Sequence, residues 1–134
     1  MKKFLSISLL LSMLFLYGCS TGTSTSNTLT TNQLFEKKQE CAKYKESLQK
    51  EIDKTTQELE SVWDFYNEKI NEIFYSVSKN SCFALTNEIR QHGENTLKYK
   101  KIIDLLSNDT TNYDEKESLN MTYYYEKIKE LKWE

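Results

Sequence analysis

The sequence predicts an α+β fold in which a long helix, a β-hairpin and a terminal helix follow one another. Three observations support this order. Apolar residues recur at helical spacing from Leu34 onward, β-branched and aromatic residues flank a polar tract over residues 78–81, and helical spacing returns after Tyr113. An all-α helical bundle is the alternative, because parts of the middle segment also fit a helix.

The amino end has the three parts of an export signal. Lys2 and Lys3 form a short positive region, residues 4–17 are uncharged and mostly apolar, and the small Gly18 ends the run. The apolar run is short for a permanent membrane helix. We therefore expect a signal peptide over residues 1–18, with an uncleaved anchor helix as the alternative.

The segment from Leu16 to Cys19 resembles the lipobox of bacterial lipoproteins. Gly18 and Cys19 match its pattern, and Tyr17 stands where a small or β-branched residue is commoner. The resemblance implies cleavage before Cys19, a diacylglycerol on its thiol and an acyl chain such as palmitate on the new amino group, and several chains anchor more firmly than one. Because Ser20 follows instead of Asp, we expect the outer membrane in a host with two membranes. In a host with one membrane we expect the outer face of the cell membrane.

A polar segment follows the predicted lipid anchor. Residues 20–32 consist mainly of Ser, Thr and Asn with Leu29 as the single apolar residue, so they cannot form a core. We expect a flexible tether over residues 19–33 and one small domain over residues 34–134. Without the two lysines of the signal peptide, 16 of the 18 basic residues remain against 20 acidic ones, a net charge of −4. Basic and acidic residues alternate, which argues against nucleic-acid binding and leaves the lipid as the membrane contact.

The cysteine count predicts a disulfide. The chain has three cysteines, and assigning Cys19 to the lipid leaves Cys41 and Cys82. In an oxidising compartment such a pair is most simply bonded, and closing a loop of about 40 residues would stabilise the fold by roughly 4 kcal/mol. A zinc or redox site is the weaker interpretation, because the chain has no CxxC motif and one histidine. We expect no metal and no cofactor.

The first predicted helix begins near Leu34, and no Pro or Gly interrupts it. A stripe of apolar residues recurs at steps of three, four or seven, and charged residues occupy the other faces. The coiled-coil alternative has too few heptads and Thr55 at a core position, so we expect the helix to pack on its own domain. The stripe consists of Cys41, Tyr44, Leu48, Ile52, Leu59, Val62 and Tyr66.

A β-hairpin is predicted between Asn71 and Ile89, with its turn near Lys79 and Asn80. β-branched and aromatic residues lie on both sides of this polar turn. Continuation of the first helix through Val77 is the alternative, because several apolar residues before it keep the helical step.

The rest of the chain is predicted from polarity and spacing. Residues 90–96 and 107–112 are polar and predict loops. Residues 97–106 fit both a strand and a helix, so both remain open. Helical spacing returns from Tyr113 to Trp133, and lysines near the end of this segment suit the helix dipole.

The segments Glu72–Ser76 and Asn80–Cys82 resemble a pattern found in small, uncharacterised bacterial proteins. In those proteins a helix with a Lys-Lys-Gln-Glu-Cys-like start comes first, matched by residues 37–41, and a strand like residues 99–106 follows. Val77 stands where the pattern has Pro. The resemblance covers most of the mature chain and implies a helix, a three-stranded antiparallel meander and a terminal helix. It implies no function.

The sequence predicts no catalytic site. His92 is the only histidine, and it lies in a polar stretch. Asp114, Glu115 and Glu117 stand at the start of the last predicted helix, where acidic residues complement the helix dipole. The oxygen-rich run over residues 108–114 lacks the Gly and the acid that a calcium loop needs at its sixth and twelfth positions. We therefore expect a protein that is not an enzyme.

The last predicted helix carries the unusual aromatic content. Consecutive helical residues point in different directions, so at most two of its three adjacent tyrosines can be buried together. We expect a partner-binding face here, with a role in the core as the alternative. The residues concerned are Tyr123, Tyr124, Tyr125 and Trp133.

The expected function follows from the anchor and the missing catalytic site. We expect a non-enzymatic, membrane-anchored envelope lipoprotein that contacts another envelope protein. The alternative is a tethered binder of a small ligand or of cell-wall glycan, using a groove between the long helix and the sheet.

Overall fold

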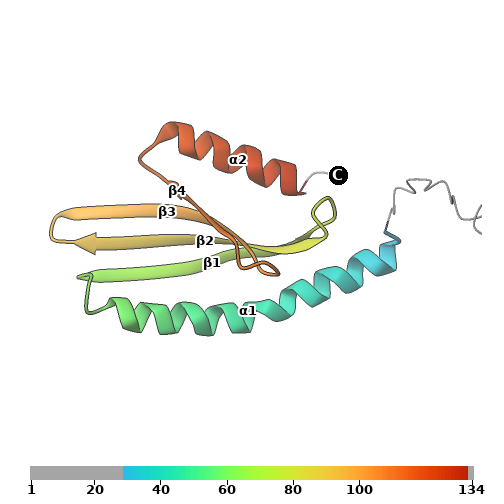
Figure 1. The fold of residues 1–134 in the computed structure, drawn as a ribbon, viewed down its shortest axis with the longest axis horizontal. Coiled ribbons are helices and arrows are strands. Elements are labelled where there is room, and N and C mark those ends of the chain that lie inside the picture. Colours follow the sequence, from blue (N-terminus) through green and yellow to red (C-terminus); the bar gives the residue numbers. More distant parts are fainter. Residues whose placement is uncertain (1–28, 133–134) are drawn as a thin grey trace, which may run out of the picture.

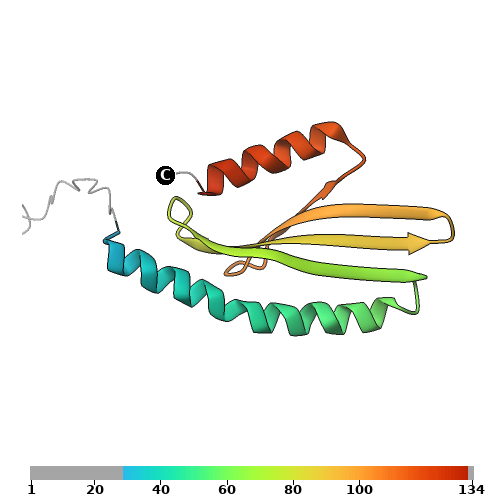
Figure 2. The ribbon, with the colours of Figure 1, turned by 180° about the vertical axis from the view of Figure 1, so that it is seen from behind.

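Two helices lie on opposite faces of a four-stranded antiparallel sheet in the computed structural model, which describes residues 29–132 (Figures 1 and 2). The α+β class is confirmed, but the sheet has four strands where three were expected, in the order β1-β2-β3-β4. The signal peptide, Cys19, the first part of the tether and Trp133 lie outside the described residues. In chain order the elements are α1 (Thr31–Leu59), β1 (Phe65–Ser76), β2 (Ser81–His92), β3 (Asn95–Asp104), β4 (Thr110–Asp114) and α2 (Ser118–Lys132).

Helix α1 begins at a capping box. The Thr30 hydroxyl accepts a hydrogen bond from the backbone N–H of Gln33, and the Gln33 side chain accepts one from the backbone N–H of Thr30. The helix starts at Thr31, so the last three residues of the range 19–33 expected as tether are helical. This local cap starts the helix in a segment whose polar composition gave no helical period.

Helix α1 ends at Leu59, although the predicted stripe ran on to Tyr66. Val62 lies in the turn that follows and is 58% exposed, and Tyr66 is buried in β1. A spacing of four residues, as between these two, fits a helix and a strand equally, which is why the stripe overran the helix. The buried residues of α1, all from the predicted stripe, are Cys41, Leu48 and Ile52.

Strands β1 and β2 form the predicted hairpin. Residues 77–80 make its turn, and Asn80 has a φ of +48°, a conformation that asparagine tolerates well. The alternative of a helix continuing through Val77 is wrong.

Strands β2 and β3 form a second hairpin, so the expectation of a loop over residues 90–96 is wrong. The pairing continues to His92 opposite Asn95, and the two residues between them make the turn. Gly93 comes first in this turn with a φ of +57°, which glycine adopts at little cost. The ambiguous segment 97–106 is mainly strand.

Strand β4 was predicted as the loop over residues 107–112 and the start of the last helix. It is a short edge strand paired with β3. The sequence did not predict a strand here because four of its five residues are not apolar. Helix α2 therefore begins at Ser118, five residues later than Tyr113.

The core has two halves because β2 is covered on both faces. Cys82 and Ala84 pack toward α1, and Phe83 and Leu85 pack toward α2. The predicted disulfide is present: Cys41 of α1 bonds Cys82, with 5.4 Å between their Cα atoms. No helix within residues 29–132 is long and apolar enough to cross a membrane.

Candidate partner-binding site

The face of the sheet beneath α1 changes from apolar to charged along β2. After Cys82 and Ala84, the alternate residues on this face are polar, because side chains two apart in a strand share a face. The strands on either side add a second acid and a lysine, with Glu68 opposite Glu88 and Lys101 opposite Thr86. We call the six side chains on this part of the face the charge network: Tyr66, Glu68, Thr86, Glu88, Arg90 and Lys101.

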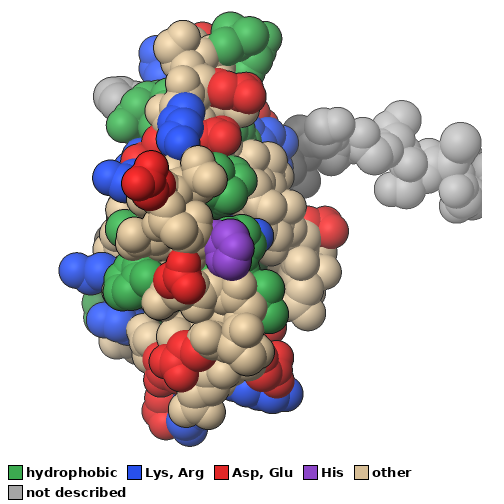
Figure 3. Space-filling view, turned by 90° about the vertical axis from the view of Figure 1, so that its left-hand side faces the viewer, with side chains coloured by type: hydrophobic (Ala, Val, Ile, Leu, Met, Phe, Trp, Pro, Cys, Tyr) green, Lys and Arg blue, Asp and Glu red, His purple; other side chains and the backbone are tan. Residues whose placement is uncertain are grey.

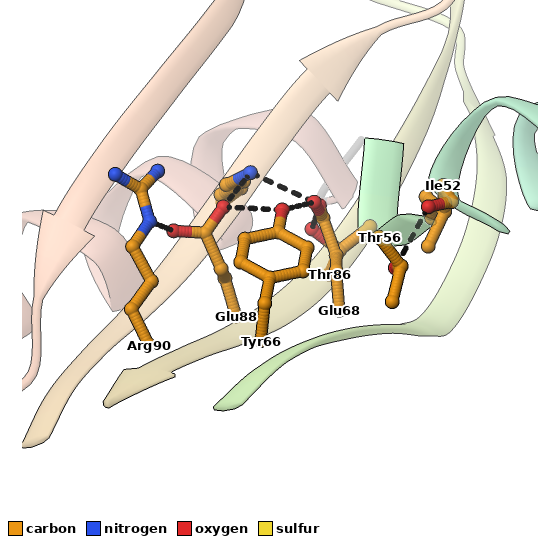
Figure 4. Close-up of polar contacts among 8 residues, drawn as sticks. Ile52, Thr56, Tyr66, Glu68, Thr86, Glu88 and Arg90 are labelled. Carbon is orange, nitrogen blue, oxygen red and sulfur yellow. Dashed lines mark hydrogen bonds and ion pairs between the residues drawn. The ribbon is translucent and has the colours of Figure 1, made fainter. Parts of the chain in front are cut away.

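Lys101 holds the two carboxylates of the charge network together. Its Nζ lies 2.9 Å from Oε2 of Glu68 and also pairs with Oε2 of Glu88. The Tyr66 hydroxyl lies 3.0 Å from the same two oxygens, and the Thr86 hydroxyl donates to Oε1 of Glu68 at 2.6 Å (Figure 4). The Glu88 side chain is fully buried. In the described part of the chain, no buried polar side-chain atom lacks a hydrogen-bond partner.

The charges of the network cancel. Burial tends to raise the pKa of Glu88, but hydrogen bonds from Arg90 and Lys101 outweigh it and hold that pKa below its ordinary value. Burial and the two neighbouring carboxylates raise the pKa of Tyr66, so its hydroxyl keeps its proton and donates it. Two carboxylates therefore face two cations, and the groups satisfy one another. The network can support a neighbouring residue, but it offers no free base or nucleophile.

Arg90 connects the buried charge network to the surface of the protein. Its Nε donates to Oε1 of Glu88, and its side chain is 33% exposed. The guanidinium carbon lies 5.7 Å from the ring centre of Trp63 and 5.5 Å from that of Tyr99, both within cation–π distance. The hydrogen bonds of residues 29–132 leave its two terminal nitrogens, Nη1 and Nη2, without a partner, and both point away from the network (Figure 4). We call Trp63, Arg90 and Tyr99 the Arg90 cluster.

The Arg90 cluster lies at the end of the molecule where α1 finishes and the β2–β3 turn begins. His92 marks this end in the space-filling view, with hydrophobic and acidic side chains around it (Figure 3). Its ring meets Trp63 edge-on at 6.2 Å between centres, and its Nδ1 lies 3.9 Å from Oδ2 of Asp64. His92 is thus exposed and joined to an acid, with no nucleophile beside it among the described contacts.

The Arg90 cluster is chemically equipped for binding. A guanidinium with free terminal nitrogens can make two parallel hydrogen bonds to a planar anion. Trp, Tyr and Arg are also the residue types most enriched where protein interfaces concentrate their binding energy. Within residues 29–132 no group of three side chains is placed to hold a metal ion.

The residues predicted for partner binding are only partly available. Tyr123 and Tyr125 are 55% and 60% exposed on the two flanks of α2, whereas Tyr124 is buried against the sheet. Burial, with a smaller contribution from Tyr125, raises the pKa of Tyr124 to about 12. Helix α2 covers the opposite face of the sheet from the charge network, so these tyrosines and the Arg90 cluster form separate surfaces. Trp133 and Cys19 lie outside the described residues.

A cavity of about 260 Å³ lies between α1 and the β3–β4 edge, where the sequence predicted a groove for a small ligand. Its walls mix polar and apolar side chains, whereas small-molecule sites are lined mostly by apolar ones. The lining residues are Tyr44, Ser47, Leu48, Glu51, Ile103, Leu105, Asn108 and Thr110.

Sequence reasoning missed the Arg90 cluster because it placed Arg90 in a loop. Gly93 was the available signal. A two-residue turn at that glycine sets the register of the second hairpin, and the register places Arg90 and Tyr99 on one face. Trp63 could not be found this way, since it comes from the connection after α1.

Comparison of the chain with protein-family models, with curated protein sequences and with solved structures gave no match.

Proposed function

We propose that this protein is an exported, lipid-anchored envelope protein, without enzymatic activity, that works by binding another envelope protein through the Arg90 cluster. The lipobox-like segment ending at Cys19 supports the anchor. One observation carries the binding role: Trp63, Arg90 and Tyr99 come from three separate segments and meet at one partly exposed end of the domain.

The position of the Arg90 cluster relative to the anchor supports this role. The tether enters the domain at Thr31, and Trp63 follows the last turn of α1. The 29 residues of α1 span about 43 Å, so the cluster and the tether lie at opposite ends of the domain (Figure 1). A lipid on Cys19 would therefore leave the cluster free to reach a partner away from the membrane surface.

The charge network supports binding over a purely structural role for Arg90. Lys101 contacts both buried carboxylates of the network, so these acids have a buried cation that does not depend on Arg90. Arg90 contacts Glu88 through Nε, and its other two nitrogens have no hydrogen-bond partner among residues 29–132, so they are available to an outside group. The cavity beside α1 has a partly polar lining, whereas small-molecule sites are lined mostly by apolar side chains, so the alternative, a binder of a small ligand or wall glycan, is the weaker proposal.

Site-specific photo-crosslinking in living cells tests the proposal. A benzoylphenylalanine at Val62, next to Trp63, should give one discrete adduct whose partner is identified by mass spectrometry as an envelope protein. The matched control is Phe35, which is 60% exposed compared with 58% for Val62 but lies near the start of α1. A third variant, at Tyr123, tests the α2 surface. The same adduct from all three positions, or an adduct from Tyr123 alone, would contradict a binding role for the Arg90 cluster.

The anchor is tested separately by labelling cells with a fatty-acid probe. The wild-type protein should carry the label, and Cys19→Ala should abolish it. Equal labelling of the two proteins would show that the lipid is attached to a residue other than Cys19.

A further inference from the structure

We infer that the Arg90 cluster binds a carboxylate group that projects from the partner protein. This inference rests on the proposed function, because it names the chemical group that the proposed partner presents.

The unused donors of Arg90 define what can bind. A guanidinium has five N–H donors in a rigid planar fork. One donor, on Nε, bonds the buried Glu88, and the four on Nη1 and Nη2 have no partner among the described residues. Two of these donors point the same way along one edge of the fork, an arrangement that matches the two oxygens of a carboxylate.

The cluster is already organised before a ligand arrives. Glu88 is fully buried, and its second oxygen bonds Lys101 and lies within hydrogen-bond distance of the Tyr66 hydroxyl. Glu88 therefore fixes Arg90 from the buried side of the sheet. Trp63 lies beside the guanidinium on the β1 side and Tyr99 on the β3 side. A guanidinium restrained in this way loses little side-chain entropy when a ligand binds, which favours affinity.

The local charge favours a carboxylate over a phosphate. The two cations of the charge network are balanced by Glu68 and Glu88, so the cluster has no surplus positive charge. Asp64 directly follows Trp63 in the chain, and its carboxylate accepts a hydrogen bond from the backbone N–H of Gly93. Lys98, on the adjoining strand, lies on the opposite face of the sheet from Tyr99. A phosphate carries a charge of about −1.5 to −2 and would meet one shared guanidinium, whereas a carboxylate carries a single charge.

The surroundings of Arg90 favour a protein over a free small acid. Val62 is 58% exposed and directly precedes Trp63, whose ring centre lies 5.7 Å from the guanidinium carbon, so exposed apolar surface continues along the chain from that ring. Apolar residues around a central charged contact keep water away from it when a second protein surface covers them. A small free acid would leave this apolar surface in water.

Peptide titrations of the full mature protein in detergent test the inference. The readouts are the NMR signals of the Arg90 Nε–H and of the Trp63 indole, and Trp133→Phe identifies the second indole. The probes are acetyl-Ala-Glu-Ala-amide, its Gln counterpart, and acetyl-Ala-Ala-Ala with a free terminal carboxylate. A phosphoserine peptide of the same length completes the set. We expect at least one of the two carboxylate peptides to bind about tenfold more tightly than the Gln peptide, a difference of about 1.4 kcal/mol.

The variants and the probes separate the explanations. Arg90→Lys keeps a cation beside Glu88 but loses the fork, so binding of the carboxylate peptide should fall about tenfold while the fold is retained. Lys98→Gln, on the other face, should bind as the wild type does. Tighter binding by the Glu peptide points to an acidic side chain of the partner, and tighter binding by the free terminus points to a chain end. Binding of both carboxylate peptides no tighter than that of the Gln peptide, or preference for phosphoserine, would overturn the inference.

The crosslinking assay distinguishes failure of this inference from failure of the proposed function. If the Val62 adduct still forms at full yield with Arg90→Lys, the partner binds without a carboxylate on Arg90, and the inference alone is wrong. If the wild-type protein gives no adduct while the carboxylate peptides bind, the proposed protein partner is wrong and the carboxylate site stands.

Discussion

Replacing Lys101 by methionine removes the cation that contacts both buried carboxylates of the charge network. Methionine keeps much of the apolar stem of lysine, so the change reports mainly on charge and less on packing. At pH 7 Glu68 and Glu88 would face each other across the Tyr66 hydroxyl, 3.0 Å from each, without their shared cation. We expect a clear loss of stability.

The expected size of the loss follows from burial and from the contacts that remain. Removing one partner of a buried ion pair costs about 3–5 kcal/mol. The Lys101 side chain is 13% exposed, Glu88 keeps Arg90, and Glu68 keeps the hydroxyl of Thr86, so the lower end applies. The variant should unfold with a free energy about 3 kcal/mol lower than the wild type. With a urea dependence of about 1.5 kcal/mol per molar, the midpoint should fall by about 2 M.

Urea titration of the oxidised protein at several pH values measures this loss and its cause. In the wild type, the hydrogen bonds to Glu88 depress its pKa, so its stabilising effect is present above the unfolded pKa of about 4.5 and is lost as the pH falls through the folded value. In Lys101→Met, burial should instead raise the pKa of one of the two carboxyls. The folded variant then takes up a proton before the unfolded chain does, and its deficit should shrink as the pH is lowered from about 7 to about 5.

Lys98→Met is the matched control, since Lys98 is an exposed lysine of the same strand on the other face. It should change the free energy of unfolding by no more than about 0.5 kcal/mol. Two results would refute the reasoning. One is a Lys101→Met variant as stable as the control, and the other is a deficit that stays constant with pH, which would mean that Lys101 acts by packing alone.

Three further predictions follow from the described contacts. Replacing Cys41 and Cys82 by serine should lower the free energy of unfolding by about 4 kcal/mol, because the disulfide closes a sequence separation of 41 residues; urea titration checks this, and a variant as stable as the oxidised wild type would contradict it. The free energy of unfolding of the wild type should fall as the pH rises above about 10, because the raised pKa of Tyr66 keeps its hydroxyl protonated in the folded state while the unfolded chain loses that proton. Tyr66→Phe should lose less stability over this range. Equal losses of stability in the two proteins between about pH 9 and pH 11 would contradict the raised pKa of Tyr66. Gly93→Ala should cost about 1 kcal/mol, because alanine is strained at a φ of +57° although its Cβ would meet no neighbour; an unchanged melting temperature would disprove this.

Local sequence patterns predicted most elements of the fold. The apolar stripe located α1 and its buried residues, and the polar tract before Ser81 located the first hairpin turn. The predictions were wrong where one spacing fits both a helix and a strand, or where a polar segment forms a strand because it pairs with a neighbouring strand. The spacing between Val62 and Tyr66 fits a helix and a strand, and the polar β4 is a strand because β3 supplies its hydrogen-bond partners.

The candidate site was harder to predict, because its residues look ordinary one at a time. The sequence singled out adjacent tyrosines on α2, and the structure buries Tyr124 while leaving Tyr123 and Tyr125 on separate flanks. A single arginine in a polar stretch gives no signal. The surroundings of Arg90 depend on a buried acid two residues before it and on rings from two other segments, which lie too far away in the sequence for a local pattern to include them.

The sequence by itself determined the class of fold, the pairing of Cys41 with Cys82 and the expectation of a lipid on Cys19, which still awaits its test. The fold class and the cysteine pairing follow from periodicity and counting, whereas the expectation of a lipid follows from the resemblance of residues 16–19 to a lipobox. Only the tertiary structure decided that two acids and two cations share one buried face, and that Arg90 emerges from it between Trp63 and Tyr99. The physical reason is that strand register and helix placement, set by the burial of the whole core, bring together side chains that are distant in sequence.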